Sequence, residues 1–165
     1  MSSFSIWLLL EKESRSNYRK ITKSISKRLE GPIFEPHCTI YGHLNTDIES
    51  LKPFVTDLAK NYNQFSAGVK KIKSGDSFSK SLYVSVKNSG AIKQLNSICK
   101  NKFIGLRKYG FDPHISIAYG IFSKEEIYFA TKNIIIPDHI VFNGLSIVKI
   151  GKNVKNWETV FQRQF

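Results

Sequence analysis

A seven-residue motif that occurs twice constrains this chain more than any other feature. The first copy is Phe34-Glu35-Pro36-His37-Cys38-Thr39-Ile40, and the second is Phe111-Asp112-Pro113-His114-Ile115-Ser116-Ile117. Both copies keep an aromatic residue, an acid, a proline, a histidine, a hydroxyl and an isoleucine in the same positions. The repeat predicts two similar structural units, each of which presents one histidine and one hydroxyl to an acid/base site.

Each motif is expected to begin a β-strand. Side chains at i and i+2 share one face of a strand, so His37 points with Thr39 and His114 points with Ser116. Positions 38, 40, 42 and 44 are Cys, Ile, Gly and Leu, whereas positions 37, 39, 41 and 43 are His, Thr, Tyr and His. This alternation is typical of a strand with one buried face. The prolines before both histidines favour strand starts there.

The segments around the motifs predict an α+β chain in which each half repeats the order helix, motif strand, helix, strands. Helices are expected after a cap at Ser14 or Ser16 and up to Gly31-Pro32, after a capping box at residues 46–49, after Ser89, and from a capping box at residues 123–126 to about Asn133. Strands are expected at residues 5–10, 67–72, 82–86, 140–150 and 159–164, the second and third of which form a hairpin around Ser74-Gly75-Asp76. We therefore expect residues 1–165 to form one domain of two similar lobes, related by a pseudo-twofold axis that places the histidines across a cleft.

The charge of the chain favours phosphate-bearing ligands. The sequence has 25 Lys and Arg against 13 Asp and Glu, a formal net charge of +12, which attracts such ligands electrostatically. Two basic segments, residues 70–73 and 100–108, are candidates to guide a phosphorylated substrate. The alternative is that these two segments are solvated faces of the molecule, which is the usual role of a run of charges.

Cysteine, histidine and hydropathy patterns exclude several classes of protein. Cys38 and Cys99 lie on apolar faces and are expected to be free core thiols. The histidines have no metal-ligand spacing and no CxxC or HExxH motif occurs, so we expect neither a metal nor a cofactor. Residues 5–10 are too short an apolar run for a secretory signal, and no stretch is long enough to span a membrane. We expect a cytoplasmic monomer that does not bind membranes.

The paired histidines and hydroxyls suit phosphodiester chemistry. In-line displacement at phosphorus needs a base for the nucleophile and, on the opposite side, an acid for the leaving oxygen. Histidine, with an ordinary pKa of about 6.5, can serve in either role near neutral pH. The hydroxyls of Thr39 and Ser116 can donate hydrogen bonds to the non-bridging oxygens, where negative charge gathers. This arrangement needs no metal.

The two motifs together resemble those of the 2H phosphoesterase superfamily. The resemblance extends to its cyclic phosphodiesterase branch through Ser5-Ile6-Trp7-Leu8, Ser74-Gly75 before Leu82-Tyr83-Val84, and Trp157-Glu158-Thr159-Val160. The serine at position 116 also agrees with that branch. The resemblance implies a bilobal, pseudo-twofold 2H phosphoesterase fold, in which two antiparallel sheets line a central cleft and helices cover the outside.

The resemblance also implies an activity and a set of residues. The activity is hydrolysis of 2',3'-cyclic nucleotides, ADP-ribose 1'',2''-cyclic phosphate or both to a phosphomonoester, with the 2'-phosphate as product from nucleotides, within RNA metabolism. His37 and His114 would be the acid/base pair, with the base undecided, and Thr39 and Ser116 would bind phosphate.

Trp7 and Tyr119 match positions of the branch that flank the base or ribose, although both also fit a core role. Tyr119 has the opposite strand parity to His114 and reaches a cleft only if the strand bends or ends first. His43, at a strand end, is expected at the surface.

Two other functions remain open at the level of sequence. One is an RNA enzyme that acts on 2',3'-cyclic ends or 2',5'-linkages, or that resembles an RNA ligase, with the same residues. The other is a non-catalytic RNA-binding module that keeps the fold. The intact paired motifs argue against the second.

Overall fold

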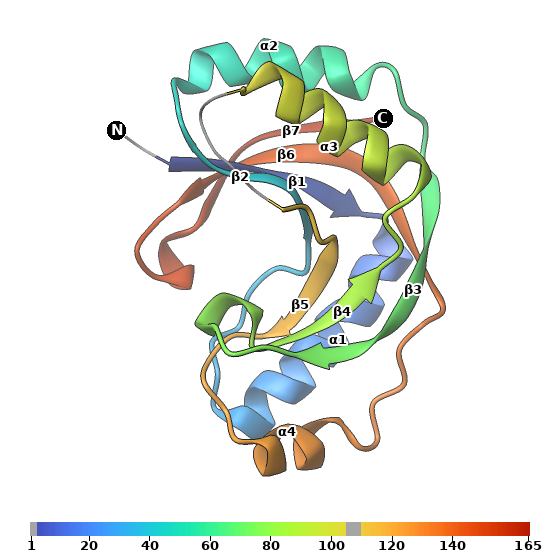
Figure 1. The fold of residues 1–165 in the computed structure, drawn as a ribbon, viewed down its shortest axis with the longest axis vertical. Coiled ribbons are helices and arrows are strands. Elements are labelled where there is room, and N and C mark those ends of the chain that lie inside the picture. Colours follow the sequence, from blue (N-terminus) through green and yellow to red (C-terminus); the bar gives the residue numbers. More distant parts are fainter. Residues whose placement is uncertain (1–2, 105–109) are drawn as a thin grey trace.

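The computed structural model describes residues 3–104 and 110–165, which form an α+β fold and confirm the class expected from the sequence (Figure 1). The helices are α1 (Lys12–Leu29), α2 (Ile48–Ala59), α3 (Gly90–Lys102) and α4 (Lys124–Thr131), with short 3-10 turns η1 (Phe78–Lys80) and η2 (Val154–Asn156). The strands are β1 (Ser3–Leu10), β2 (Cys38–Asn45), β3 (Phe65–Ser74), β4 (Leu82–Val86), β5 (His114–Ala118), β6 (His139–Ile150) and β7 (Glu158–Gln164).

The strands form a sheet that closes on itself. Its order is β1-β2-β5-β4-β3-β6-β7, all neighbours are antiparallel, and β6 pairs with β1 as well. Six strands therefore complete a ring, and β7 extends from β6. The two separate sheets expected from the sequence are instead joined, at one point by Cys38 and Ile115 of β2 and β5 and at another by β3 and β6.

The helices cover the ring in an order that does not follow the two halves of the sequence. α2 packs on β6 and β7, and α3, from the second half, packs on β2 of the first half. α1, from the first half, packs on β5 and α4. Figure 1 accordingly shows α2 and α3 together at one end of the molecule, and α1 and α4 toward the other. The division of the chain into two similar lobes stays a prediction.

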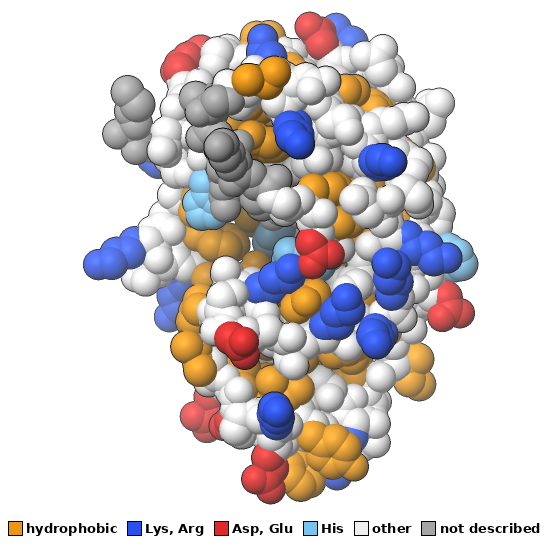
Figure 2. All heavy atoms as spheres, viewed as in Figure 1, with side chains coloured by type: hydrophobic (Ala, Val, Ile, Leu, Met, Phe, Trp, Pro, Cys, Tyr) orange, Lys and Arg blue, Asp and Glu red, His pale blue; other side chains and the backbone are white. Residues whose placement is uncertain are grey.

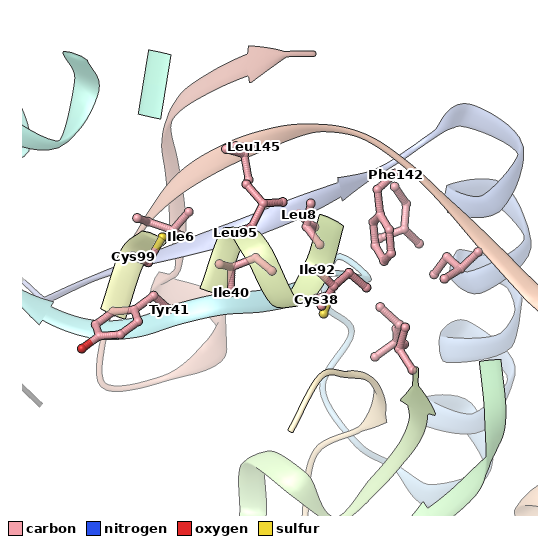
Figure 3. Close-up of a cluster of buried hydrophobic side chains, with 14 of the residues drawn as sticks. Ile6, Leu8, Cys38, Ile40, Tyr41, Ile92, Leu95, Cys99, Phe142 and Leu145 are labelled. Atoms are coloured by element: carbon pink, nitrogen blue, oxygen red, sulfur yellow. The ribbon is translucent and has the colours of Figure 1, made fainter. Parts of the chain in front are cut away.

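The first motif strand departs from regular alternation. Ile6 of β1 pairs with Tyr41, whereas Trp7 pairs with Thr39, so Ile40 is an extra residue in β2. This bulge turns Tyr41 into the core, where its side chain is only 2% exposed. The prediction that Tyr41 shares the face of His37 is therefore wrong. Figure 3 shows Ile40 and Tyr41 of β2 in the core, next to the side chains that α3 contributes.

The start of each helix shows where local sequence was informative. The Ser123 capping box of α4 is confirmed by reciprocal hydrogen bonds with Glu126. α1 begins earlier than expected, because the cap is the carboxylate of Glu11, which accepts from two backbone N–H groups. α2 is capped by Asp47, which accepts from the N–H of Ser50, rather than by a box at residues 46–49.

Three further expectations concern cysteines, hydropathy and the basic segment. Cys38 and Cys99 are buried free thiols, as predicted. No helix in the described ranges combines the length and the apolar character needed to cross a bilayer. The basic segment at residues 100–108 begins inside α3, and residues 105–108 of it lie outside the described residues.

A buried hydrogen bond ties α3 to the bulge of β2, and its loss should destabilise the protein. Asn96 is 8% exposed, and its Nδ2 donates to the carbonyl of Ile40 at 2.8 Å. Asn96→Ala removes this buried hydrogen bond, so we expect the free energy of unfolding in urea to fall by about 1 to 3 kcal/mol. Gln94→Ala, exposed on the same helix, is the control and should change it by less than about 0.5 kcal/mol. Equal effects of the two substitutions would contradict this role of Asn96.

Candidate active site

A cleft of about 340 Å³ brings together all six residues singled out from the sequence. Figure 2 shows histidine side chains in a hollow of this face, with Lys and Arg side chains beside it, and a further histidine at the right-hand edge. The six residues come from β1, β2, β5 and the segments next to them, and they are Trp7, His37, Thr39, His114, Ser116 and Tyr119.

The two motifs meet at one backbone pairing. β2 and β5 are antiparallel and pair through Cys38 and Ile115, the residues that stand between the histidine and the hydroxyl of each motif. Both of these side chains are fully buried. Because neighbouring side chains in a strand point to opposite faces, the histidine and hydroxyl on either side of each point into the cleft. Because the pairing is antiparallel, His37 lies on the side of Ser116, and His114 lies on the side of Thr39.

Both histidine rings are held in the same way. Nδ1 of His37 lies 2.7 Å from the carbonyl oxygen of Glu35, and Nδ1 of His114 lies 2.7 Å from that of Asp112. A carbonyl only accepts hydrogen bonds, so each Nδ1 carries its proton and donates it. In the neutral ring Nε2 is then the nitrogen that can take up a proton. The repeated acid-proline-histidine sequence thus produces two imidazoles with the same tautomer.

His37 is the more enclosed of the two. Its ring stacks on Trp7, with centroids 3.4 Å apart and planes 6° from parallel, and the residue is 8% exposed. Burial, opposed by the hydrogen bond to Glu35, lowers the pKa of His37 to about 4. The pKa of half-buried His114 is also lowered, first by desolvation, against the hydrogen bond to the carbonyl of Asp112. Both rings are therefore mostly neutral at pH 7 without a bound anion.

The acid of each motif pairs with a cation from another element. Arg19 of α1 holds Glu35 with two hydrogen bonds of 2.9 Å, and Nζ of Lys80 lies 2.6 Å from Oδ2 of Asp112. This hydrogen bond to Lys80 is the largest cause of the lowered pKa of Asp112. The carbonyls that orient the histidines belong to these same two acids. The ion pairs therefore fix the segments that hold the imidazoles.

Thr39, Ser116 and Tyr119 also line the cleft. Thr39 is half-buried, and Ser116 is 5% exposed and donates to the carbonyl of Ser79 at 3.3 Å. β5 ends at Ala118, so the parity objection to Tyr119 does not apply. Tyr119 is 3% exposed, lines the cleft and stacks on Phe34 with centroids 4.0 Å apart. Like Trp7, it is both a buried residue and part of the cleft wall.

Gly120 explains why β5 ends where it does. Its φ of 154° lies in the region that favours glycine, and a Cβ there would overlap the ring of Phe122. The chain turns at this glycine directly after Tyr119. The turn therefore takes Tyr119 out of strand alternation and toward the cleft.

Sequence reasoning missed several residues of the cleft. Trp157 was quoted only as part of a resemblance, yet its ring lies edge-on at 5.7 Å from both Trp7 and Tyr119. Lys80 had no local signal, because the turn η1 places it. His43 is exposed, as expected, but it also lines the rim of the cleft. Its φ of 56° belongs to the left-handed region, which a regular strand pattern does not anticipate.

Within residues 3–104 and 110–165, no three His, Cys, Asp or Glu side chains converge in a way that could hold a metal ion. The polar groups that converge on the cleft are imidazoles, hydroxyls and the Lys80–Asp112 pair. This set can move protons and donate hydrogen bonds to an anion.

Known proteins of one family are similar to this chain in sequence and in fold. The family model of the 2'-5' RNA ligase superfamily matches residues 14–134. A cyclic phosphodiesterase of Arabidopsis thaliana is 22% identical over 166 residues, which cover 95% of this chain and 92% of that protein. Among solved structures, TT0787 of Thermus thermophilus has a TM-score of 0.66 at 13% identity, and the match covers 98% of this chain and 97% of that chain. E. coli LigT complexed with phosphate has a TM-score of 0.61 at 12% identity, with 99% and 96% covered.

The burial of His37 should appear in the pH dependence of stability. The unfolded chain protonates this histidine near its ordinary pKa of 6.5, whereas the folded protein does so only at about 4. Between these values the unfolded state binds the extra proton, so the free energy of unfolding should fall as the pH drops from 6.5 to 4. His37 alone contributes about 3 kcal/mol to this fall.

Urea unfolding at several pH values measures this contribution. His37→Gln should remove about 3 kcal/mol of the pH dependence, and His139→Gln, at an exposed position of β6, is the control. An NMR titration of the wild-type imidazole gives the midpoint directly, in case the variant folds poorly. A His37 midpoint near 6.5 would contradict the burial argument.

Proposed function

This chain belongs to the 2'-5' RNA ligase superfamily, and on that premise we propose that it is a cyclic phosphodiesterase. Its substrates would be 2',3'-cyclic nucleotides, ADP-ribose 1'',2''-cyclic phosphate or both. The product would be a phosphomonoester, the 2'-phosphate in the case of nucleotides. His37 and His114 would act as the acid/base pair, Thr39 and Ser116 as phosphate binders, and Trp7 and Tyr119 as contacts to base or ribose.

One observation carries the proposal: two imidazoles of the same tautomer line one cleft, each next to a hydroxyl of its own motif. Acid/base catalysis on opposite sides of a phosphorus atom needs two proton-transfer groups of this kind. Two relatives add support. The Arabidopsis relative is a cyclic phosphodiesterase, and LigT structures contain phosphate or 3'-AMP.

The proposed reaction is a single in-line displacement. One neutral histidine takes a proton from water through Nε2 as the water oxygen bonds to phosphorus. The bond from phosphorus to the 3'-oxygen breaks, and the second histidine, in its protonated form, gives that oxygen a proton. The hydroxyls of Thr39 and Ser116 donate to the non-bridging oxygens as charge builds there. The orientation of the substrate decides which histidine is the base.

The lowered pKa values suit this scheme. A neutral imidazole is the form that a base needs, and burial keeps His37 neutral. The acid must be protonated, and a bound phosphate anion raises the pKa of the imidazole next to it. The substrate would therefore help to form the acid that acts on it.

An RNA end is the second candidate substrate, supported by the description of the family and by the net charge of +12. It would use the same histidines and hydroxyls, so substitutions there do not separate it from a small nucleotide. Substrate length separates the two, because binding of a longer chain weakens steeply with salt. A non-catalytic RNA-binding role would remain if neither substrate were hydrolysed.

Loss of either histidine should abolish turnover. We expect His37→Ala and His114→Ala each to lower kcat for 2',3'-cyclic AMP by about 100-fold to 10,000-fold, because general acid/base catalysis contributes about that much. Ligand affinity should change little. Phosphorus NMR with excess EDTA measures the rate and shows whether a 2'- or a 3'-monoester forms. His139→Ala is the control, and wild-type turnover in either cleft variant would refute the acid/base roles.

The hydroxyls should matter for both binding and rate. Thr39→Val and Ser116→Ala each remove one donor to phosphate, so we expect kcat/KM to fall about 10-fold to 100-fold, through kcat and KM together. Thr39→Ser and Ser116→Thr keep the donor and are the matched controls. Steady-state kinetics on the same cyclic nucleotide provides the test. Retained rates in Thr39→Val and Ser116→Ala would remove the phosphate-binding role.

A further inference from the structure

A second cavity, of about 630 Å³, opens beside the histidine cleft. His43, Ser79, Ile150 and Trp157 line both cavities, so the two spaces adjoin. The rest of the second cavity is built by residues 151–156 of the β6–β7 connection, by Phe78 of the turn η1 and by Pro32. Figure 1 shows the connection and the turn η1 on the same side of the sheet. A ligand longer than one nucleotide could therefore extend from the cleft into this space.

The second cavity is basic and has an open aromatic face. Lys152 and Lys155 line it and are exposed, and neither forms an ion pair with another described residue. No acidic side chain among the described residues is part of its lining. Phe78 lines this cavity, is 51% exposed, and its ring stacks on that of Tyr119 with centroids 6.2 Å apart. Free ammonium groups suit phosphate, and an exposed ring suits a base.

The wall between the two cavities is held in place by its own hydrogen bonds. The indole Nε1 of Trp157 donates to the carbonyl of Gly151 at 3.1 Å, and the backbone N–H of Trp157 donates to the carbonyl of Val154 at 3.1 Å. A Cβ at Gly151 would lie 2.6 Å from Cβ of Asn156, so the loop closes tightly at this glycine. The side chains of residues 152–156 are thus carried by a compact turn. Such a turn loses little conformational freedom when a ligand binds.

We propose that this second cavity binds a nucleoside that is joined through phosphate to the unit carrying the cyclic phosphate. Lys152 and Lys155 would contact the linking phosphate, Phe78 would stack on the base, and Asn153 and Asn156 would supply hydrogen-bonding groups. The proposal rests on the proposed function, since it names the larger class of substrate for the same cleft. The linker could be the diphosphate of ADP-ribose or the phosphodiester of an RNA end, which share this chemistry.

Calorimetric binding tests the proposal without any need for turnover. The ligands are adenosine 2'-monophosphate, ADP-ribose, and an adenosine dinucleotide with a terminal 2'-phosphate. Wild-type protein should bind at least one of the two larger ligands about tenfold more tightly than the mononucleotide. Lys152→Gln/Lys155→Gln should remove most of that preference, with a smaller effect on the mononucleotide, and should weaken the salt dependence of binding.

Two further variants sharpen the result. Lys93→Gln/Lys100→Gln removes the same charge from exposed positions of α3, so it separates a local site from the net charge of the protein. Phe78→Ala should weaken binding of the preferred larger ligand about fivefold or more, whereas Phe78→Tyr should keep it.

Each outcome decides one point. Three results would overturn the second site. The first is equal affinity of the wild type for small and large ligands, and the second is an equal loss of affinity for both in Lys152→Gln/Lys155→Gln. The third is a loss of affinity in Lys93→Gln/Lys100→Gln equal to that in Lys152→Gln/Lys155→Gln. Preference for ADP-ribose or for the dinucleotide identifies the linker. If the larger ligand binds preferentially but no cyclic phosphate is hydrolysed, the proposed function fails while the second site stands.

Discussion

The cleft depends on a single backbone pairing between β2 and β5. Cys38 and Ile115 pair there, and both side chains are completely buried. Strand alternation then leaves no choice for their neighbours: the histidine and the hydroxyl of each motif must face the other side of the sheet. The same pairing brings the two copies of the motif together in antiparallel order. One constraint on the backbone thus sets the direction of four polar side chains.

The ring of strands keeps this pairing in place. β6 pairs with β1, the neighbour of β2, and with β3, the neighbour of β4, so β2 and β5 are also connected through the other four strands. Burial to 8% exposure keeps water from most of the His37 ring. The low pKa of His37 follows from that exclusion of water and from the stacked ring of Trp7. Stability of the sheet and proton affinity in the cleft are therefore linked.

The sequence was sufficient for features that depend on neighbouring residues. Strand alternation placed His37 with Thr39, and the repeat placed His114 with Ser116, because these relations need only local backbone geometry. The same alternation failed at Tyr41, where a bulge forced by pairing with β1 shifts the phase. Lys80 and Trp157 could not be placed, since a turn and a hairpin connection carry them to the cleft from distant parts of the chain. The joining of the two expected sheets also depends on β6, whose pairing with β1, β3 and β7 no local pattern reveals.

The two copies of the motif have diverged most in what surrounds them. His37 lies between aromatic rings, and the acid of its motif is held by Arg19 on α1. His114 is less enclosed, and the acid of its motif is held by Lys80, a cation that itself lines the cleft. The backbone plan is nevertheless shared, because both rings donate from Nδ1 to a carbonyl of their own motif. Burial lowers the pKa of both histidines, and it encloses His37 more completely than His114. Two imidazoles of one tautomer in unlike surroundings are therefore the result of one motif placed in two parts of the fold.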